Sequence, residues 1–154
     1  MDESIRKQLE KPQTWFCKYF PKRIQNVGEK EIADRQLVYD FKDGRAFETV
    51  VAQMTAARMI EEHGNRCSQL VFIPVPASSV RKNEIRYMNF CKRVCELTGA
   101  INGYDHVRVC GERLAIHENR MAEKEIRKVS IIEFDEEWFR GKAVIVFDDV
   151  ITRG

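Results

Sequence analysis

Residues 142–154 read KAVIVFDDVITRG, and this stretch predicts how the rest of the chain is organised. Its residues 143–147 form an apolar run rich in β-branched side chains. Such a run is too short to span a membrane and is typical of a strand buried on both faces of a parallel sheet. Asp148 and Asp149 follow at once. Because adjacent anions repel each other and are costly to bury unpaired, we expect them at the carboxyl edge of the sheet, where open α/β folds bind ligands.

The segment VIVFDDVITRG resembles the phosphoribosyl-pyrophosphate motif of type I phosphoribosyltransferases, a hydrophobic strand followed by two acids, two apolar residues and a Thr/Gly loop. The resemblance implies that Asp148 and Asp149 hold the ribose hydroxyls. It also implies a loop that wraps the 5′-phosphate with backbone N–H groups, which agrees with the anion-binding nests that turns form. An ordinary strand ending in a solvated Asp-Asp turn is the alternative interpretation. The implied loop residues are Val150, Ile151, Thr152, Arg153 and Gly154.

A second strand–loop–helix unit is predicted at residues 70–97. Residues 70–76, LVFIPVP, form an apolar strand whose prolines limit hydrogen bonding at its end. A small polar loop follows, then a basic helix start at residue 83, and Gly99 closes the helix. Small residues let the backbone approach a polyanion, the helix start offers N–H donors, and the basic side chains add mobile positive charge for phosphate oxygens. The candidate pyrophosphate-binding residues are Ala77, Ser78, Ser79, Arg81, Lys82 and Arg86.

This unit resembles the ComF-like branch of the family in particular. Members of that branch carry Pro-Val-Pro, then spaced arginines, then Arg-Gly-Phe-Asn-Gln. Residues 86–90, RYMNF, keep the Arg and the Asn of the last motif and lack its Gly and Gln. The similarity covers about residues 20–154. A solvated basic helix start that binds no ligand is the alternative interpretation.

The remaining segments alternate between strand and helix patterns. Residues 36–41, QLVYDF, predict a strand, and Asp43-Gly44 predicts a turn. Residues 45–63 predict a helix that ends at Gly64. Its expected core-facing stripe consists of Phe47, Val50, Val51, Met54, Ala57 and Ile60. In the next helix, the expected core-facing residues are Ile85, Met88, Cys91, Val94 and Cys95.

Short strands are predicted at residues 106–110 and 129–134, and a short helix or turn at residues 135–140. The family resemblance makes the charged segment 111–127 a mobile hood over the active site. Alternating strands and helices predict an α/β fold with a mainly parallel sheet flanked by helices. The resemblance implies a type I phosphoribosyltransferase-like (Rossmann-like) version of that fold, incomplete at the C-terminus. The expected organisation is an N-terminal arm, residues 1–30, and one domain, residues 31–154.

The composition excludes several classes of protein. The net charge of +2 is too balanced for binding to nucleic acid or membranes through bulk charge. No apolar run approaches the ~20 residues of a membrane span, and the N-terminus lacks the apolar core of a signal peptide. We therefore expect a cytoplasmic protein with no membrane partner. The five cysteines include no Cys-x-x-Cys pair, so a disulfide framework is not expected. Cys91 and Cys95 fit core positions better than a zinc site with His117.

The arm contains an aromatic cluster with interspersed lysines. Trp15, Phe16, Tyr19 and Phe20 precede Pro21. Such a cluster can dock a terminal arm on the core, and it can also stack on the bases of single-stranded DNA.

The resemblance implies phosphoribosyl transfer from phosphoribosyl pyrophosphate, with Mg²⁺ as cofactor, to an unidentified acceptor. Asp148 and Asp149 would be the catalytic residues beneath the ribose ring, and would reach the metal indirectly through the Mg²⁺-bound substrate. Because the sequence stops at Gly154, inside the phosphate loop, we expect the 154-residue chain to be weakly active or inactive alone. The alternative is a non-catalytic nucleotide- or single-stranded-DNA-binding module, since the ComF-like branch is associated with DNA uptake. A NAD-type Rossmann domain is excluded because no Gly-x-Gly-x-x-Gly follows any strand.

Overall fold

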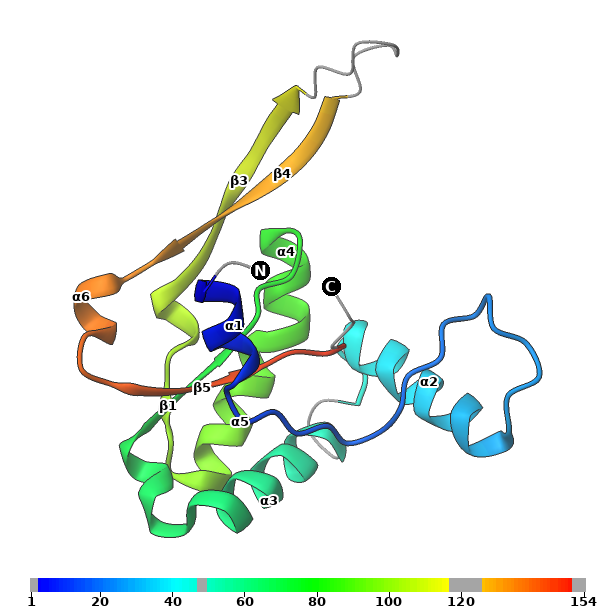
Figure 1. Cartoon of the computed structure of the whole chain (residues 1–154), viewed down its shortest axis with the longest axis horizontal. Helices are drawn as coiled ribbons and strands as arrows, with labels where there is room; N and C mark the ends of the chain where they lie inside the picture. The colour runs from blue at the N-terminus through cyan, green and yellow to red at the C-terminus, as the bar shows by residue number, and fades with distance from the viewer. Residues whose placement is uncertain (1–2, 47–49, 117–125, 151–154) are drawn as a thin grey trace. The chain divides into compact units, whose positions relative to one another are not determined.

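A computed structural model of the chain describes residues 3–46, 50–116 and 126–150. The chain divides into two compact units, Met1–Gln36 and Leu37–Gly154, and the boundary falls within a helix. None of the described helices has the length and apolar character needed to cross a membrane. The helices and strands, shown in Figure 1, are α1 (Glu3–Leu9), α2 (Glu29–Lys42), α3 (Ala52–His63), β1 (Leu70–Pro74), α4 (Val80–Asn83), α5 (Asn89–Thr98), β2 (Ile101–Asn102), β3 (Val107–Ile116), β4 (Ile126–Phe134), α6 (Glu136–Phe139) and β5 (Ala143–Phe147).

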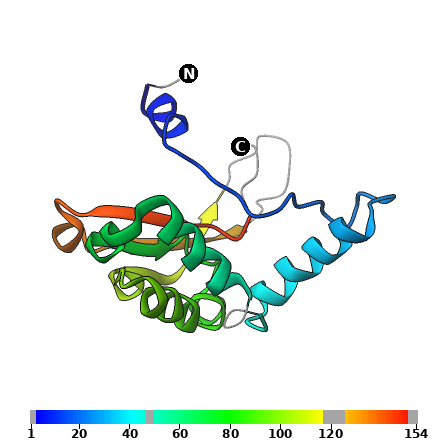
Figure 2. The same cartoon turned by 90° about the horizontal axis from the view of Figure 1, so that it is seen from below.

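The second unit is built on a three-stranded parallel sheet with the order β2-β1-β5. Strands β1 and β5 pair along their whole length, from Leu70 opposite Ala143 to Pro74 opposite Phe147. Helices α3 and α5 lie together on one side of these strands, as Figure 2 shows. The prediction of an α/β fold with a parallel sheet flanked by helices is therefore confirmed.

The core on the helix-covered face is rich in aromatic rings. Phe41, Phe72, Phe90 and Phe147 pack with ring centroids 4.7–6.2 Å apart, mostly edge-to-face. Edge-to-face packing is a favourable arrangement for such rings. The cluster joins α2, β1, α5 and β5 into one hydrophobic core.

The predicted strand at residues 36–41 is wrong, because these residues form the last turns of α2. Val38 and Phe41 are its buried residues, and their spacing of three places them on one helix face. A run of six residues fits both a strand and a helix, so packing of Phe41 against Phe90 and Phe147 decides between them.

Helix α3 begins later than predicted, at Ala52, and ends as expected at Gly64, whose N–H donates to the Ile60 carbonyl. The predicted core-facing stripe is wrong as a set, because Val50 and Ile60 are exposed and Phe47 lies outside the described residues. The predicted stripe assumes regular α-helical spacing from residue 47, whereas residues 50 and 51 are π-helical, which rotates the buried face. The buried residues of the helix are Ala52, Thr55, Ala56 and Met59.

The helix predicted to start at residue 83 starts three residues earlier, at Val80, and ends at Gly99 as expected, with φ +77°. Between α4 and α5 lies a π-helical segment, η3 (Glu84–Met88). A π turn adds a residue to the helical repeat and rotates the faces on either side of it. Ile85 and Met88 are therefore exposed, in contrast to the prediction, while Tyr87 is buried with Phe90.

The other face of the sheet is covered only in part. Val71 and Ile73 pack there against Trp138 and Phe139 of α6. On β5 the prediction of burial on both faces is wrong, because Val146 is 59% exposed. No element among the described residues covers this part of β5.

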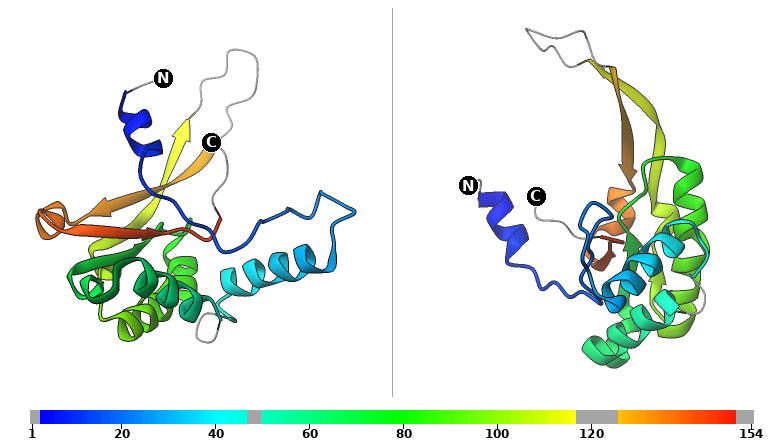
Figure 3. Two further views of the ribbon diagram at one scale, coloured as in Figure 1. Left: turned by 60° about the horizontal axis from the view of Figure 1, so that its bottom comes forward. Right: turned by 90° about the vertical axis from the view of Figure 1, so that its right-hand side faces the viewer.

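Strands β3 and β4 pair antiparallel, from Val107 opposite Phe134 to Ile116 opposite Ile126, with an irregularity between Val109 and Glu112. They are longer than the predicted strands at residues 106–110 and 129–134. Both views of Figure 3 show this two-stranded ribbon extending beyond the parallel sheet. It includes parts of the predicted hood, whereas residues 117–125, with His117, lie outside the described residues.

In the first unit, Arg35, in the middle of α2, ties that helix to the segment that precedes it. Its Nε donates to the Phe20 carbonyl at 2.8 Å and its Nη2 to the Ile24 carbonyl at 3.3 Å. Lys18 lies over the Phe20 ring, with 5.3 Å from its Nζ to the centroid. The Trp15 side chain is 73% exposed.

Candidate functional site

Strands β1 and β5 end at the same level of the sheet. Pro74 pairs with Phe147, and the Val75 N–H donates to the Phe147 carbonyl at 2.7 Å. The two chain segments that leave this edge are the small loop containing Ser78 and the segment that starts with Asp148 and Asp149. The structure therefore starts both predicted ligand-binding segments side by side at the carboxyl edge.

Asp149 is partly buried and ion-paired with two cations. Its Oδ2 lies 2.8 Å from Arg86 Nη1 and 3.7 Å from Lys42 Nζ. The side chains of Arg86 and Asp149 are only 16% and 11% exposed. A guanidinium–carboxylate contact at this distance is a charge-assisted hydrogen bond.

Asp148 lies in a different environment. Its side chain is exposed, and it forms no ion pair among the described residues. Partial desolvation and the neighbouring Asp149 raise its pKa, while the backbone N–H groups of Asp149 and Val150 oppose that shift. The two adjacent acids are therefore unequal: one is neutralised by protein cations, and the other faces solvent.

The π-helical segment η3 holds Arg86 in place. Arg86 Nε donates to the Lys42 carbonyl at 3.4 Å, and its guanidinium carbon lies 5.6 Å from the centre of the Tyr87 ring. The Tyr87 side chain is fully buried, and burial raises the pKa of its hydroxyl. Arg86 is thus a fixed group, whereas the sequence suggested a mobile charge.

The loop after β1 is organised by Asn83. The buried Asn83 side chain accepts the Ala77 N–H at 2.9 Å, and its Nδ2 lies 3.5 Å from the Tyr104 hydroxyl. Ser79 caps α4 by accepting the Lys82 N–H at 3.3 Å. Asn83 and Ser79 thus hold the two ends of the loop by hydrogen bonds, and Ser78 lies exposed between them.

Arg81 and Lys82 lie in the first turn of α4. Both side chains are exposed and form no ion pair among the described residues. They are therefore the cations of this edge whose charge is open to a ligand.

The structure brings Asp148, Asp149 and Arg86 to one edge, as the sequence predicts. Val150 is described at the same edge, whereas the other predicted loop residues, Ile151, Thr152, Arg153 and Gly154, lie outside the described residues.

Sequence reasoning missed two residues of the site, Lys42 and Asn83. Lys42 was missed because it directly follows the segment wrongly predicted as a strand. A signal for Asn83 exists, since it lies four residues after the capping serine.

The described residues of this edge do not form a metal site by themselves. No group of three or more His, Cys, Asp or Glu side chains among the described residues is arranged to hold a metal. The Asp149 Oδ2 already contacts two cations, so Asp148 is the carboxylate open to a metal-bearing ligand. Mg²⁺ is commonly bound by one or two carboxylates together with substrate phosphates and water.

Comparisons with known proteins give no relative on which to base an assignment. No family model, no curated protein and no solved structure matches the chain.

Proposed function

We propose that the carboxyl edge of β1 and β5 binds phosphoribosyl pyrophosphate with Mg²⁺, and that the protein transfers the phosphoribosyl group to an acceptor. The observation that carries this proposal is the 2.7 Å hydrogen bond from Val75 N–H to the Phe147 carbonyl, which starts the acidic pair and the serine loop at one level. Carboxylates are acceptors for sugar hydroxyls, and a loop of small residues suits a diphosphate. One edge thus offers complementary groups for both halves of the same ligand.

The residues have separate roles in this proposal. Asp148 and Asp149 accept hydrogen bonds from the ribose hydroxyls. The segment 77–79 presents its backbone and hydroxyl groups to the diphosphate, whose charge Arg81 and Lys82 help to balance.

Bond cleavage at C1′ leaves positive charge on the sugar, and the carboxylates beneath the ring stabilise that charge. Mg²⁺, when bound with the ligand, would neutralise charge on the departing diphosphate.

A calorimetric titration with phosphoribosyl pyrophosphate, with and without Mg²⁺, tests the proposal. We expect binding only when Mg²⁺ is present. The double substitution Asp148→Asn with Asp149→Asn should weaken binding by at least about 100-fold, because two charged acceptors are lost.

The matched control is Glu136→Gln with Glu137→Gln, which removes the same charge from two adjacent exposed acids in α6. The control should bind like the unmodified chain. Equal affinity of the aspartate variant and the control would reject the proposed site.

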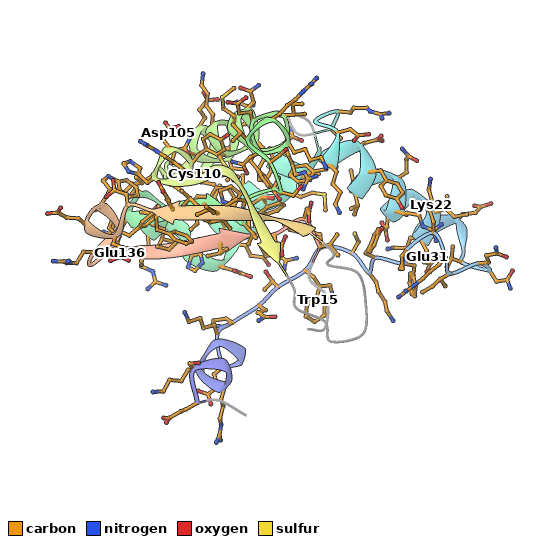
Figure 4. All side chains as sticks on the ribbon, turned by 90° about the horizontal axis from the view of Figure 1, so that it is seen from above. Trp15, Lys22, Glu31, Asp105, Cys110 and Glu136 are labelled. Carbon is orange, nitrogen blue, oxygen red and sulfur yellow. The ribbon has the colours of Figure 1, made fainter. Side chains whose placement is uncertain are left out.

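A second candidate function is binding of single-stranded DNA by the arm. The Trp15 side chain, labelled in Figure 4, is 73% exposed, and residues 11–23 carry four basic and no acidic side chains. Stacking of a base on an exposed aromatic ring contributes about 1–3 kcal/mol.

Fluorescence anisotropy with a labelled oligothymidine tests this candidate. We expect an affinity that falls steeply with salt, needs no Mg²⁺ and drops in Trp15→Ala. Absence of oligonucleotide binding at low salt would remove this candidate and leave the proposed transferase unaffected.

A further inference from the structure

The charge of Arg86 is paired with a group of the protein itself. Its guanidinium contacts the Asp149 carboxylate at 2.8 Å and the Lys42 carbonyl at 3.4 Å, and lies over the Tyr87 ring. A guanidinium has five N–H donors in a rigid fork, so each such contact restricts where the others point. With its side chain 16% exposed, Arg86 has little surface left for a second anion.

We propose that Arg86, together with Lys42, is a positioning residue that orients Asp149 toward the ribose, and that Arg86 does not bind the diphosphate. This inference rests on the proposed function, since it divides the roles within the same site. The charge of the diphosphate is then balanced by Arg81 and Lys82, whose exposed side chains make no ion pair among the described residues.

The two cations reach Asp149 from different elements. Lys42 is the last residue of α2, and Arg86 belongs to the π-helical segment η3. A carboxylate oxygen contacted from two elements has less freedom to rotate than one held by a single flexible side chain. A preorganised acceptor favours binding of a ribose hydroxyl, because the carboxylate then loses little rotational freedom when the ligand binds.

A close backbone contact fixes the end of α2 against η3. Gly44 follows α2 with φ +75°, and a Cβ added there would lie 2.8 Å from the Ile85 carbonyl oxygen. This close approach brings the Lys42 carbonyl beside Arg86, and only glycine tolerates both the conformation and the contact. The turn at Gly44 therefore places Lys42 next to Arg86 and restrains both residues.

Two probes separate a positioning role from direct binding of the diphosphate. Ribose 5-phosphate carries the hydroxyls without a diphosphate, and Mg²⁺-pyrophosphate carries the diphosphate without a sugar. In calorimetric titrations of the full chain, Arg86→Gln should lower the affinity for ribose 5-phosphate by about tenfold or more. The affinity for pyrophosphate should stay nearly unchanged. The matched variant Arg81→Gln should show the opposite pattern.

A double-mutant cycle tests whether Arg86 acts through Asp149. Arg86→Gln with Asp149→Asn should bind ribose 5-phosphate no more weakly than Asp149→Asn alone, because the group that Arg86 orients has already lost its charge. Arg86→Lys keeps the charge without the fork, and should restore part of the ribose 5-phosphate affinity lost in Arg86→Gln. A purely structural role would not separate the two probes. Arg86→Lys also provides the measurement if Arg86→Gln does not fold.

Three outcomes overturn the inference: weakened pyrophosphate binding in the Arg86 variants, additive losses in the cycle, or no change for either probe. A wild-type chain that binds neither probe overturns the proposed function itself. The two failures are thus distinguishable, because only the second one is seen in the unmodified protein.

Discussion

Arg86 and Asp149 form a hydrogen-bonded ion pair, with 2.8 Å between Nη1 and Oδ2, although 63 positions separate them in the sequence. The pair joins the π-helical segment to the chain that directly follows β5. Because both side chains are partly buried, it is screened less by solvent than a surface pair. The same contact therefore bears on stability as well as on the proposed site.

The pair should stabilise the fold measurably. In a double-mutant cycle with Arg86→Met and Asp149→Asn, urea unfolding should give a coupling energy of about 1–3 kcal/mol. The exposed pair Arg93–Glu96, 3.5 Å apart, is the control and should give less than about 1 kcal/mol. Equal coupling in the two cycles would contradict this expectation.

The aromatic core should be sensitive to truncation at Phe41, which is 2% exposed. Phe41→Ala should lower the free energy of unfolding by about 3–5 kcal/mol, because it leaves a cavity among three other rings. Ile32→Ala changes an exposed residue of the same helix and should stay within about 0.5 kcal/mol. Denaturant unfolding measures both, and a small loss for Phe41→Ala would show that α2 does not contribute to the core.

Two glycines with positive φ offer a matched comparison. Gly44 has φ +75° and faces the Ile85 carbonyl, whereas Gly64 has φ +54° and an added Cβ there meets nothing within 4 Å. Gly64 has ψ −129°, a conformation open mainly to glycine, so Gly64→Ala should cost about 1–3 kcal/mol for backbone strain alone. Gly44→Ala should cost more, because the new methyl group also collides with the carbonyl oxygen. Equal losses in thermal unfolding would disprove the close approach.

The raised pKa of Asp148 predicts a pH-dependent cost to stability. Desolvation and the neighbouring Asp149 make the folded chain hold this proton more tightly than the unfolded chain does. Stability contributed by this group is therefore lost as the pH rises from the unfolded pKa of ~3.9 through the raised folded value. Asp148→Asn removes that loss, so it should raise the melting temperature at neutral pH, with a smaller gain at about pH 3.

The control for this prediction is Asp105→Asn, which changes an exposed aspartate in the same unit. It should not reproduce the pH profile of Asp148→Asn. A gain at Asp148 that grows toward acid pH would reverse the sign and refute the prediction. The same variant should bind phosphoribosyl pyrophosphate more weakly, since functional groups often cost stability.

The buried thiols should be chemically inert. Cys91 and Cys95 lie in the core, and burial raises the pKa of both, that of Cys95 to about 11. Since the thiolate is the reactive form, iodoacetamide at about pH 8 should label both only as fast as the protein unfolds. Peptide mass spectrometry with and without denaturant measures the two rates. Rapid labelling of the native protein would contradict the burial of these thiols.

Several features of the fold follow from short-range sequence signals. The apolar runs at residues 70–74 and 143–147 form the paired strands β1 and β5. Gly64 and Gly99 end their helices as expected, since each has the positive φ that terminates a helix. These signals are local, because a terminating glycine and a β-branched run depend on few neighbours.

Other features depended on which groups meet in space. The helix at residues 36–41 forms because Phe41 packs with rings from α5 and β5, and a six-residue pattern carries no information about those partners. The exposed side chains at 85 and 88 follow from a π turn that shifts the helical phase.

Apolar runs, capping residues and glycines act over a few positions, so local patterns were enough to predict the strand–loop–helix units and the candidate acids. The pairing of Asp149 with Arg86 and Lys42, and the exposure of Asp148, became visible in the folded chain. Charge pairing and burial depend on distances between residues far apart in the chain, and these distances are set when the sheet and its helices pack.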